Sequence, residues 1–173
     1  MDLASLIRDI PDFPKPGIAF KDITPLLADP AGLDTAVAAL AELARPLDVE
    51  VVIAAEARGF LLGTALAREL GAGFVLARKP GKLPYTTVRA EYLLEYGTDA
   101  LELHSDAVAS GARVLVHDDL LATGGTARAL CELVEQLDGQ VVGCAFLIEL
   151  AFLHGRGRLA GYDVHSLVRY DSE

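Results

Sequence analysis

Segments of strand length and of helix length alternate along most of this chain, and this alternation restricts the fold more than any motif does. Short apolar runs that suit buried strands lie at 49–55, 74–77, 114–117, 141–150 and 164–168. Helical patterns lie at 34–45, 59–71 and 125–137, the first ended by Pro46 and the second by Gly71. Parallel strands need crossover connections and are buried on both faces. The order therefore predicts an α/β fold, a twisted parallel sheet flanked by helices.

Length and composition fit one domain of this kind, spanning residues 1–173. The chain is 52% hydrophobic and 23% charged, which is typical of a globular protein with its own core. No apolar run is long enough to cross a bilayer, and the first residues lack the basic-then-apolar pattern of a signal peptide, so we expect a cytoplasmic protein. Cys131 and Cys144 are too few for a disulfide framework and are expected to be free core thiols.

Two stretches break the alternation. Residues 11–30 hold five of the eight prolines, which predicts a fixed, irregular cap. Residues 79–105 begin with lysines among glycine and proline and end with alternating apolar and polar residues at 101–104, as in a half-exposed strand. A long insertion between regular elements is usually a lid or a binding loop, and we expect one here.

The stretch VLVHDDLLATGGTA, at 114–127, carries the clearest chemical signal. A loop that follows a parallel strand and opens a helix lies where ligands bind in open α/β sheets. Gly124 and Gly125 leave backbone N–H groups uncovered, Thr123 and Thr126 add hydroxyls, and the helix start adds partial positive charge. The loop therefore predicts a cradle for one phosphate, although neither the GxxxxGK[ST] nor the GxGxxG pattern is present.

Asp118 and Asp119 stand directly before this loop. Carboxylates would repel a phosphate, but they accept hydrogen bonds from the vicinal hydroxyls of a sugar. A phosphate on the loop and a ribose on the aspartates would make a phosphoribosyl site. The alternative is that the two aspartates only cap the turn, which explains one of them better than both.

The charge balance sets a further condition. With 15 basic and 25 acidic residues the net charge is −10, which argues against nonspecific binding to nucleic acid or to anionic membranes. A polyanionic substrate must then be attracted by local basic groups or by a metal. Arg78, Lys79, Lys82 and Arg89 lie within twelve positions and are the candidates, unless this loop is simply solvated.

Two apolar residues, two acids and a short run to Thr-Gly-Gly-Thr resemble the phosphoribosyl-diphosphate motif of type I phosphoribosyltransferases. Further stretches resemble the members of that family that act on adenine: FPKPGIAFKDITPLL at 13–27, EARGFLLG at 56–63, RKPGKLP at 78–84 and LEYGTDALELH at 94–104. The resemblance covers nearly the whole chain, and its motifs come in the family's order. It implies the type I phosphoribosyltransferase fold, with a small N-terminal hood at 1–33 and a flexible lid at about 79–105.

The resemblance also implies a reaction. Phosphoribosyl would pass from 5-phosphoribosyl 1-diphosphate to adenine, giving AMP and diphosphate in purine salvage. Mg²⁺ would be held through the substrate and not by protein ligands. Neither nucleic acid nor a membrane is expected as a partner. A homodimer is expected, with the segment from Arg58 to Gly63 near its interface.

The roles of single residues follow from the resemblance. As catalytic residues it implies Asp118 and Asp119 at the ribose, Arg58 at the diphosphate and Glu95 as the acceptor of the proton from adenine N9. As substrate-binding residues it implies Ala19, Phe20, Lys21 and Leu120 at adenine, Ala122, Thr123, Gly124, Gly125 and Thr126 at the 5-phosphate, Lys79 and Lys82 at the diphosphate, and Tyr96 sealing the site. One departure is His117, where an aliphatic residue is more usual, and we expect a buried, non-catalytic histidine.

Competing interpretations remain open for several of these residues. Arg58 could be a solvated arginine at a helix start, Phe20 an ordinary core residue, and Glu95 an exposed glutamate in a mobile loop. At the level of function, the chain could bind phosphoribosyl diphosphate only as a regulatory signal, although its charge and the lack of a DNA-binding segment oppose this. It could also act on a 6-oxopurine, and an assay with adenine, hypoxanthine and guanine would separate these possibilities.

Overall fold

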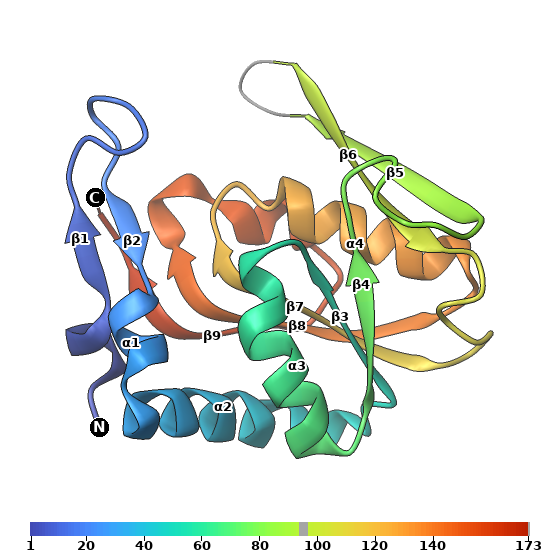
Figure 1. The fold of residues 1–173 in the computed structure, drawn as a ribbon, viewed down its shortest axis with the longest axis horizontal. Coiled ribbons are helices and arrows are strands. Elements are labelled where there is room, and N and C mark those ends of the chain that lie inside the picture. Colours follow the sequence, from blue (N-terminus) through green and yellow to red (C-terminus); the bar gives the residue numbers. More distant parts are fainter. Residues whose placement is uncertain (94–96, 173) are drawn as a thin grey trace.

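A five-stranded parallel sheet forms the centre of the molecule in a computed structural model that describes residues 1–93 and 97–172 (Figure 1). Its strands stand in the order β4-β3-β7-β8-β9. Their bounds are β3 Val51–Ala55, β4 Gly73–Ala77, β7 Arg113–Leu121, β8 Gln140–Leu150 and β9 Val164–Tyr170. The predicted α/β fold with a parallel sheet is confirmed.

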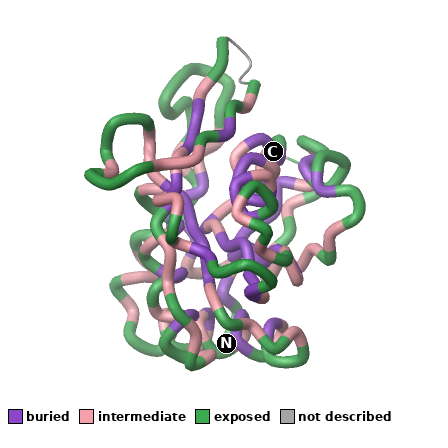
Figure 2. The backbone as a smooth tube through the Cα atoms, turned by 90° about the vertical axis from the view of Figure 1, so that its right-hand side faces the viewer, coloured by how far each residue is buried: buried purple, intermediate pink, exposed green. Residues whose placement is uncertain are grey.

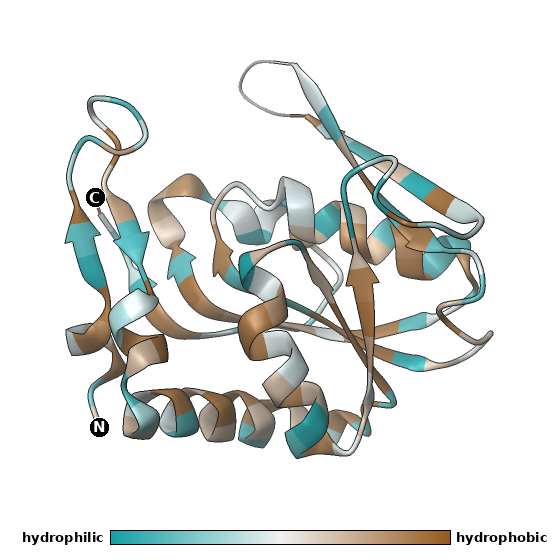
Figure 3. Ribbon diagram, in the orientation of Figure 1, coloured by the Kyte–Doolittle hydropathy of each residue, from teal (hydrophilic) through white to brown (hydrophobic). Residues whose placement is uncertain are grey.

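Helices cover both faces of this sheet, as the continuous apolar strands predict. One face carries α2 (Pro30–Ala44) and α3 (Arg58–Leu70), and the other carries α4 (Gly125–Gln136). Successive strand residues serve opposite faces, since Val52 packs with α2 and α3 whereas Ile53 packs with α4. In Figure 2 the buried segments, drawn purple, lie mostly in the interior of the molecule, and in Figure 3 the central strands carry much of the hydrophobic, brown colouring.

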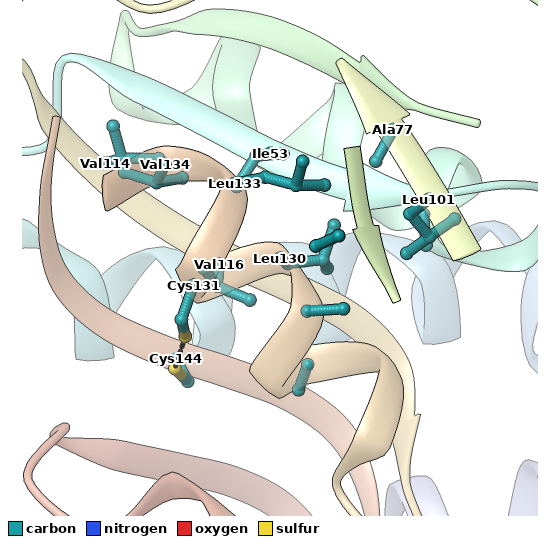
Figure 4. Packing of buried hydrophobic residues seen from close by; sticks show 14 of the residues in the cluster. Ile53, Ala77, Leu101, Val114, Val116, Leu130, Cys131, Leu133, Val134 and Cys144 are labelled. Atoms are coloured by element: carbon teal, nitrogen blue, oxygen red, sulfur yellow. Dashed lines mark hydrogen bonds between the residues drawn. The ribbon is translucent and has the colours of Figure 1, made fainter. Parts of the chain in front are cut away.

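The buried apolar cluster between the sheet and α4 contains both cysteines (Figure 4). Cys131 on α4 and Cys144 on β8 are fully buried, and their sulfur atoms lie 3.8 Å apart without a disulfide. The prediction of free core thiols is confirmed.

Local signals explain where the helices begin and end. The Asp29 carboxylate accepts a hydrogen bond from Gly32 N at 2.7 Å, and Pro30 occupies the first helical position, so α2 begins four residues before the predicted start. Helix α3 ends at Gly71, whose φ of 68° is left-handed, as predicted. Pro46 lies in a short 3-10 turn, η2 (Arg45–Leu47), that follows α2. Among the described residues, no helix is both long enough and apolar enough to span a membrane.

The prediction that β7 ends at His117 was wrong. The strand continues to Leu121, so that Asp118 and Asp119 belong to the strand and not to the loop. It extends because β8 runs on to Leu150 beside it, with Asp118 opposite Phe146 in the register. The interpretation of the two aspartates as turn caps fails for the same reason, since the loop starts only at Ala122.

The N-terminal region is more regular than predicted. After a 3-10 turn, η1 (Leu3–Leu6), strands β1 (Arg8–Ile10) and β2 (Phe20–Asp22) form an antiparallel hairpin, and α1 (Thr24–Ala28) follows. Only 11–19, between the strands, fits the irregular cap that we expected. Lys21 Nζ donates to Asp9 Oδ1 at 2.6 Å and lies 4.0 Å above the ring of Tyr170, which fastens this hairpin to β9.

A second antiparallel hairpin, of β5 (Thr87–Leu93) and β6 (Thr98–His104), rises from the other side of the molecule in Figure 1. A backbone pairing between Arg78 and Glu102 joins it to the end of β4. Leu101 and Leu103 are buried whereas Glu102 and His104 are partly exposed, which confirms the alternation predicted at 101–104.

The order of the strands determines where a ligand-binding crevice opens. From β3 the chain moves outward to β4 and then returns to β7, on the other side of β3. The carboxyl ends of β3 and β7 thus form a switch point, where connections leave in opposite directions and a crevice opens. Two further 3-10 turns, η3 (Ala151–Leu153) and η4 (Gly155–Leu159), lie between β8 and β9.

Candidate active site

Two pockets meet at the switch point between β3 and β7. The first, here the loop pocket, has a volume of about 90 Å³ and is lined by Leu120–Ala127 together with Asp118 and two residues of β5. The second, here the Arg58 pocket, has about 200 Å³ and is lined by Ala55–Arg58, Lys79, Leu101 and the acidic pair. Tyr92, Asp118 and Thr126 line both pockets, so the two adjoin.

Backbone geometry shapes the loop pocket. Gly124 has a left-handed φ of 84°, and a methyl group there would come within 2.5 Å of the carbonyl oxygen of Gly155. Glycine is therefore required both for conformation and for space. Helix α4 begins at Gly125, so the unpaired N–H groups of its first turn and its positive end face this loop. The arrangement suits one phosphate, and the predicted cradle residues Ala122, Thr123, Gly124, Gly125 and Thr126 all line the pocket.

The acidic pair lies where the two pockets join. Asp119 is buried, with 3% of its surface exposed, and its backbone N–H donates to Asp118 Oδ1 at 2.9 Å. Desolvation raises the pKa of Asp118 well above its ordinary value, and the charge of Asp119 raises it further, while Arg58 opposes the rise. A bound group with positive charge would therefore stabilise the charged form of this carboxyl.

Arg58 connects three parts of the site. It is the first residue of α3, and its Nε lies 3.2 Å from Asp119 Oδ2. Its guanidinium lies 5.0 Å from the centre of the Phe20 ring, in the N-terminal hairpin. The adjacent Gly59 allows this approach, since a methyl group there would come within 2.8 Å of Asp118 Oδ1. With 43% of its side chain exposed, Arg58 is open to a ligand and is not simply a solvated residue at a helix start.

Glu56 holds the segment after β3 against the segment after β4. Its Oε1 accepts a hydrogen bond from Lys79 N at 2.5 Å, and its Oε2 lies 3.5 Å from an Nη atom of Arg78. The backbone hydrogen bond, with help from Arg78 and Lys82, lowers the pKa of Glu56 in spite of some burial. This contact sets the position of Lys79 beside the Arg58 pocket.

The predicted basic residues differ in whether they reach the Arg58 pocket. Lys79 lines the Arg58 pocket, and its Nζ contacts Asp99 Oδ2 and lies 3.0 Å from the Tyr92 hydroxyl. Burial disfavours its charge, but these two partners outweigh burial and raise the pKa of Lys79. Lys82 is exposed and does not line the pocket, although its charge reaches Glu56. Arg89 is exposed as well and pairs with Glu91 at 3.0 Å.

The residues predicted to bind adenine occupy the hairpin and the end of β7. Phe20 is half-buried and packs edge-to-face against Phe13, with ring centres 5.2 Å apart. Ala19 directly precedes β2, and Leu120 lines the loop pocket. The side chain of Lys21 is buried in its contacts with Asp9 and Tyr170, so its predicted role can involve only its backbone.

Glu95 and Tyr96, assigned to proton transfer and to sealing, lie outside the described residues. Sequence reasoning missed Tyr92, which lines both pockets, and Asp99, which contacts Lys79. The alternation of inward and outward residues that we recognised at 101–104 extends through both strands of this hairpin, and continuing it would have placed Tyr92 and Asp99 on the inward side.

His117 is fully buried and lines neither pocket. Its Nδ1 is hydrogen-bonded to the carbonyl oxygen of Ala145 at 2.9 Å, and its Nε2 has no partner among the described residues. Desolvation lowers the pKa of His117 to about 4, so the ring is neutral at physiological pH.

A parallel sheet with a phosphate cradle, an acidic pair and an arginine loop at its switch point defines the phosphoribosyltransferase class, and residues 26–167 match the phosphoribosyl transferase domain. The adenine phosphoribosyltransferase of Rubrobacter xylanophilus is 64% identical over 95% of this chain and 89% of its own. The crystal structure of the enzyme of that name from Thermoanaerobacter pseudethanolicus has a TM-score of 0.96 at 53% identity, covering 98% of both chains. The chain belongs to the adenine phosphoribosyltransferase family.

A more distant solved relative shows a ligand. The Saccharomyces cerevisiae adenine phosphoribosyltransferase, complexed with an imino-altritol bisphosphate and adenine, is 37% identical with a TM-score of 0.90 and covers 94% of both chains.

Proposed function

We propose that this protein transfers phosphoribosyl from 5-phosphoribosyl 1-diphosphate to adenine, giving AMP and diphosphate in purine salvage. The observation that carries the proposal is the junction of the two pockets at Asp118. One pocket is a backbone cradle with no cation among its described lining residues, and the other contains Arg58 and Lys79. A ribose with a monophosphate at one end and a diphosphate at the other matches this pair of pockets.

The substrate would lie across the junction. Its 5-phosphate would bind the N–H groups of 122–126, and its diphosphate would bind Arg58 and Lys79, with Lys82 close enough to add charge. The ribose hydroxyls would then face Asp118 and Asp119. Because Arg58 Nε already lies 3.2 Å from Asp119 Oδ2, binding would draw the guanidinium from the aspartate to the diphosphate. That exchange would free the Asp119 carboxylate for the sugar.

The chemical step follows from these positions. The bond from C1 to diphosphate oxygen breaks, N9 of adenine forms the new bond to C1, and the N9 proton leaves. Positive charge develops at C1 on the way, and the two aspartates would stabilise it at short range. Arg58 and Lys79 would take up the negative charge of the departing diphosphate. Glu95 stays our prediction for the proton acceptor.

Magnesium would reach the site on its substrate. The diphosphate and ribose oxygens of phosphoribosyl diphosphate would hold Mg²⁺, and Asp118 and Asp119 in the same pocket would surround the ion with negative charge without being its direct ligands. When bound, the ion would offset negative charge on the diphosphate. The described residues hold no group of three or more His, Cys, Asp or Glu side chains placed to bind a metal.

Adenine would bind between Phe20 and Leu120. The amino group at C6 is a donor and N1 is an acceptor, so a carbonyl oxygen at Ala19 and an N–H at Lys21 would match adenine. Hypoxanthine reverses both groups, and unpaired polar groups in a closed site make rejection strong. The anchored side chain of Lys21 supports this role, since it fixes the backbone that would recognise the base.

An exposed apolar face supports the predicted homodimer. Leu61 on α3 and Leu76 on β4 are 51% and 44% exposed, and Phe60 and Phe74 pack edge-to-face beside them. In the described part of the sheet, β4 is an edge strand, so no further strand pairs with its outer side. A self-complementary contact would bury this face close to Arg58. Light scattering at micromolar concentration should give twice the monomer mass. The cytoplasmic location stays a prediction.

A spectrophotometric assay tests the proposed function. With Mg²⁺ and phosphoribosyl diphosphate present, adenine should be converted while hypoxanthine and guanine are rejected on the order of 10⁴-fold. Comparable turnover of adenine and hypoxanthine would contradict the assignment and favour a 6-oxopurine enzyme. Binding of phosphoribosyl diphosphate without turnover of any base would favour a regulatory protein.

A further inference from the structure

Among the described residues, no cation lines the loop pocket. Its described lining consists of backbone, threonine, apolar side chains and Tyr92, and the one charged side chain in that lining is Asp118. A phosphomonoester carries about −1.5 to −2 charges at neutral pH. The whole chain has a net charge of −10, so long-range attraction does not help. Backbone N–H groups and threonine hydroxyls, none of them charged, would have to balance the phosphate in this pocket.

A short turn is packed directly behind the loop. The carbonyl oxygen of Gly155, in η4, lies 2.5 Å from the place where a Cβ at Gly124 would stand. In return, a Cβ at Gly155 would come within 2.3 Å of the carbonyl oxygen of Ala122. Two backbones approach this closely only because both positions are glycine. The turn therefore has a fixed position relative to the phosphate loop.

Arg158 extends from this turn to the rim of the loop pocket. Its Cβ lies 3.2 Å from the Cβ position of Gly124, and its Nη1 lies 3.3 Å from that of Gly125. The same point beside Gly125 is 3.4 Å from Tyr92 Cδ2 and 3.5 Å from the carbonyl oxygen of Leu93, and both of these residues line the pocket. An Nη atom of Arg158, the Tyr92 ring and the carbonyl oxygen of Leu93 thus all lie close to the same point beside Gly125.

The side chain of Arg158 has no ionic or hydrogen-bonded partner within residues 1–93 and 97–172. Arg156, two residues earlier in the same turn, is different. It donates to both carboxylate oxygens of Glu149 at 2.7 Å and to the carbonyl oxygen of Val164 at 2.7 Å. Arg156 therefore holds the turn in place, whereas the charge of Arg158 is left for another group.

We propose that Arg158 binds the 5-phosphate of the phosphoribosyl substrate and of the nucleotide product, completing the cradle with the charge that it lacks. This inference rests on the proposed function, which puts that phosphate in the loop pocket. A guanidinium can bond two phosphate oxygens at once, because its donors lie in one plane. Arg158 is then a binding residue, and it should affect phosphorylated ligands only.

The test compares ligands with and without this phosphate. In Arg158→Gln, we expect Kd for ribose 5-phosphate and KM for phosphoribosyl diphosphate to rise by about 10- to 100-fold, while Kd for adenine stays unchanged. Arg158→Lys should recover part of the loss, because an ammonium keeps the charge but not the paired donors. Calorimetric titration gives the binding constants, and steady-state kinetics gives KM and kcat separately.

Arg68→Gln is the matched control. Arg68 lies in the last turn of α3, at the opposite end of that helix from Arg58, and is exposed. Its substitution removes the same charge without touching the cradle, so Kd for ribose 5-phosphate should stay as in the wild type. Equal affinities in Arg158→Gln, Arg68→Gln and wild type would overturn the inference. So would a parallel loss of adenine binding, since that would indicate general damage to the site.

The proposed function and this inference can fail separately. A wild-type protein that binds ribose 5-phosphate but forms no AMP from adenine would overturn the proposed function. If Arg158→Gln still weakened the binding of ribose 5-phosphate in that case, the phosphate site would stand.

Discussion

The Nε of Arg58 lies 3.2 Å from Oδ2 of Asp119, so the first residue of α3 faces a buried carboxylate at the end of β7. Without substrate, the arginine neutralises the acid that the proposed mechanism assigns to the ribose. Substrate binding would separate these two groups, because Arg58 would then bind the diphosphate and Asp119 the ribose hydroxyls.

Arg58→Gln should therefore lower kcat/KM for phosphoribosyl diphosphate by about 10- to 100-fold, through loss of charge-assisted hydrogen bonds to the diphosphate. Arg58→Lys should recover little, because a lysine cannot present two donors in one plane. Arg68→Gln, which removes an exposed arginine from the far end of α3, serves as the control. An Arg58→Gln enzyme with wild-type kinetics would show that Arg58 does no more than pair with Asp119.

Asp118→Asn together with Asp119→Asn should keep the fold and nearly abolish transfer, since no charge would remain to stabilise the ribosyl cation. Circular dichroism measures the fold, and initial rates measure the chemistry. A folded double variant with near-normal rates would remove both aspartates from the mechanism.

Asp118 should also affect stability in a pH-dependent way. Its pKa is raised in the folded protein, chiefly by desolvation, so the folded state disfavours the charged form. The resulting penalty is absent below the unfolded pKa of about 3.9 and grows as pH rises through the folded pKa. Asp118→Asn should thus raise Tm relative to wild type at pH 8 and much less at pH 4.5. Equal gains at both values would mean that the charge is not the cause.

His117 should produce the opposite trend. Burial lowers its pKa to about 4, whereas an unfolded histidine titrates at about 6.5, so between these values the unfolded state binds more protons. The free energy of unfolding should fall by up to about 1.4 kcal/mol per pH unit in this window as pH decreases. Urea unfolding at pH 7 and pH 5 should show this slope, and His117→Val should reduce it by that amount. An unchanged slope in the variant would assign it to other groups.

Gly124→Ala should disrupt the phosphate cradle. The added methyl group would come within 2.5 Å of the carbonyl oxygen of Gly155, in addition to the strain of a left-handed φ of 84°. We expect Kd for ribose 5-phosphate to rise by more than about 10-fold as the loop shifts. Gly161→Ala is the matched control, because its φ is 95° and nothing lies within 4 Å of the new methyl group. If both variants bind alike, the close contact with Gly155 has no bearing on the cradle.

The sequence predicted the central layer well, for a physical reason. Strands that are buried on both faces must be apolar throughout, and Val51–Ala55 and residues 114–116 stand out against amphipathic helices. The end of β7 did not stand out, because Asp118 and Asp119 look like loop residues unless one knows that β8 continues beside them. Where a strand ends depends on how far its neighbouring strand continues. That neighbour is distant in sequence, so the local composition does not reveal the end of the strand.

The same limit applies to the site. The motif at 114–127 located the cradle, but the basic cluster could not show that Lys79 faces the Arg58 pocket while Lys82 does not. That choice depends on the pairing of Arg78 with Glu102 and on the hydrogen bond from Lys79 to Glu56. Arg158 lay in a stretch without any recognised motif, and only the packing of η4 against the loop brings it to the pocket.

The anchoring of Lys21 between Asp9 and Tyr170 has a consequence for biosynthesis. A ribosome makes the hairpin of β1 and β2 long before it makes β9, so the contact between Lys21 and Tyr170 cannot form until translation of β9 is finished. Contacts between segments this distant in sequence form late, because closing the intervening chain costs entropy. The part of the site proposed to recognise the base is therefore translated first, whereas one of the contacts that fix its position forms only at the end.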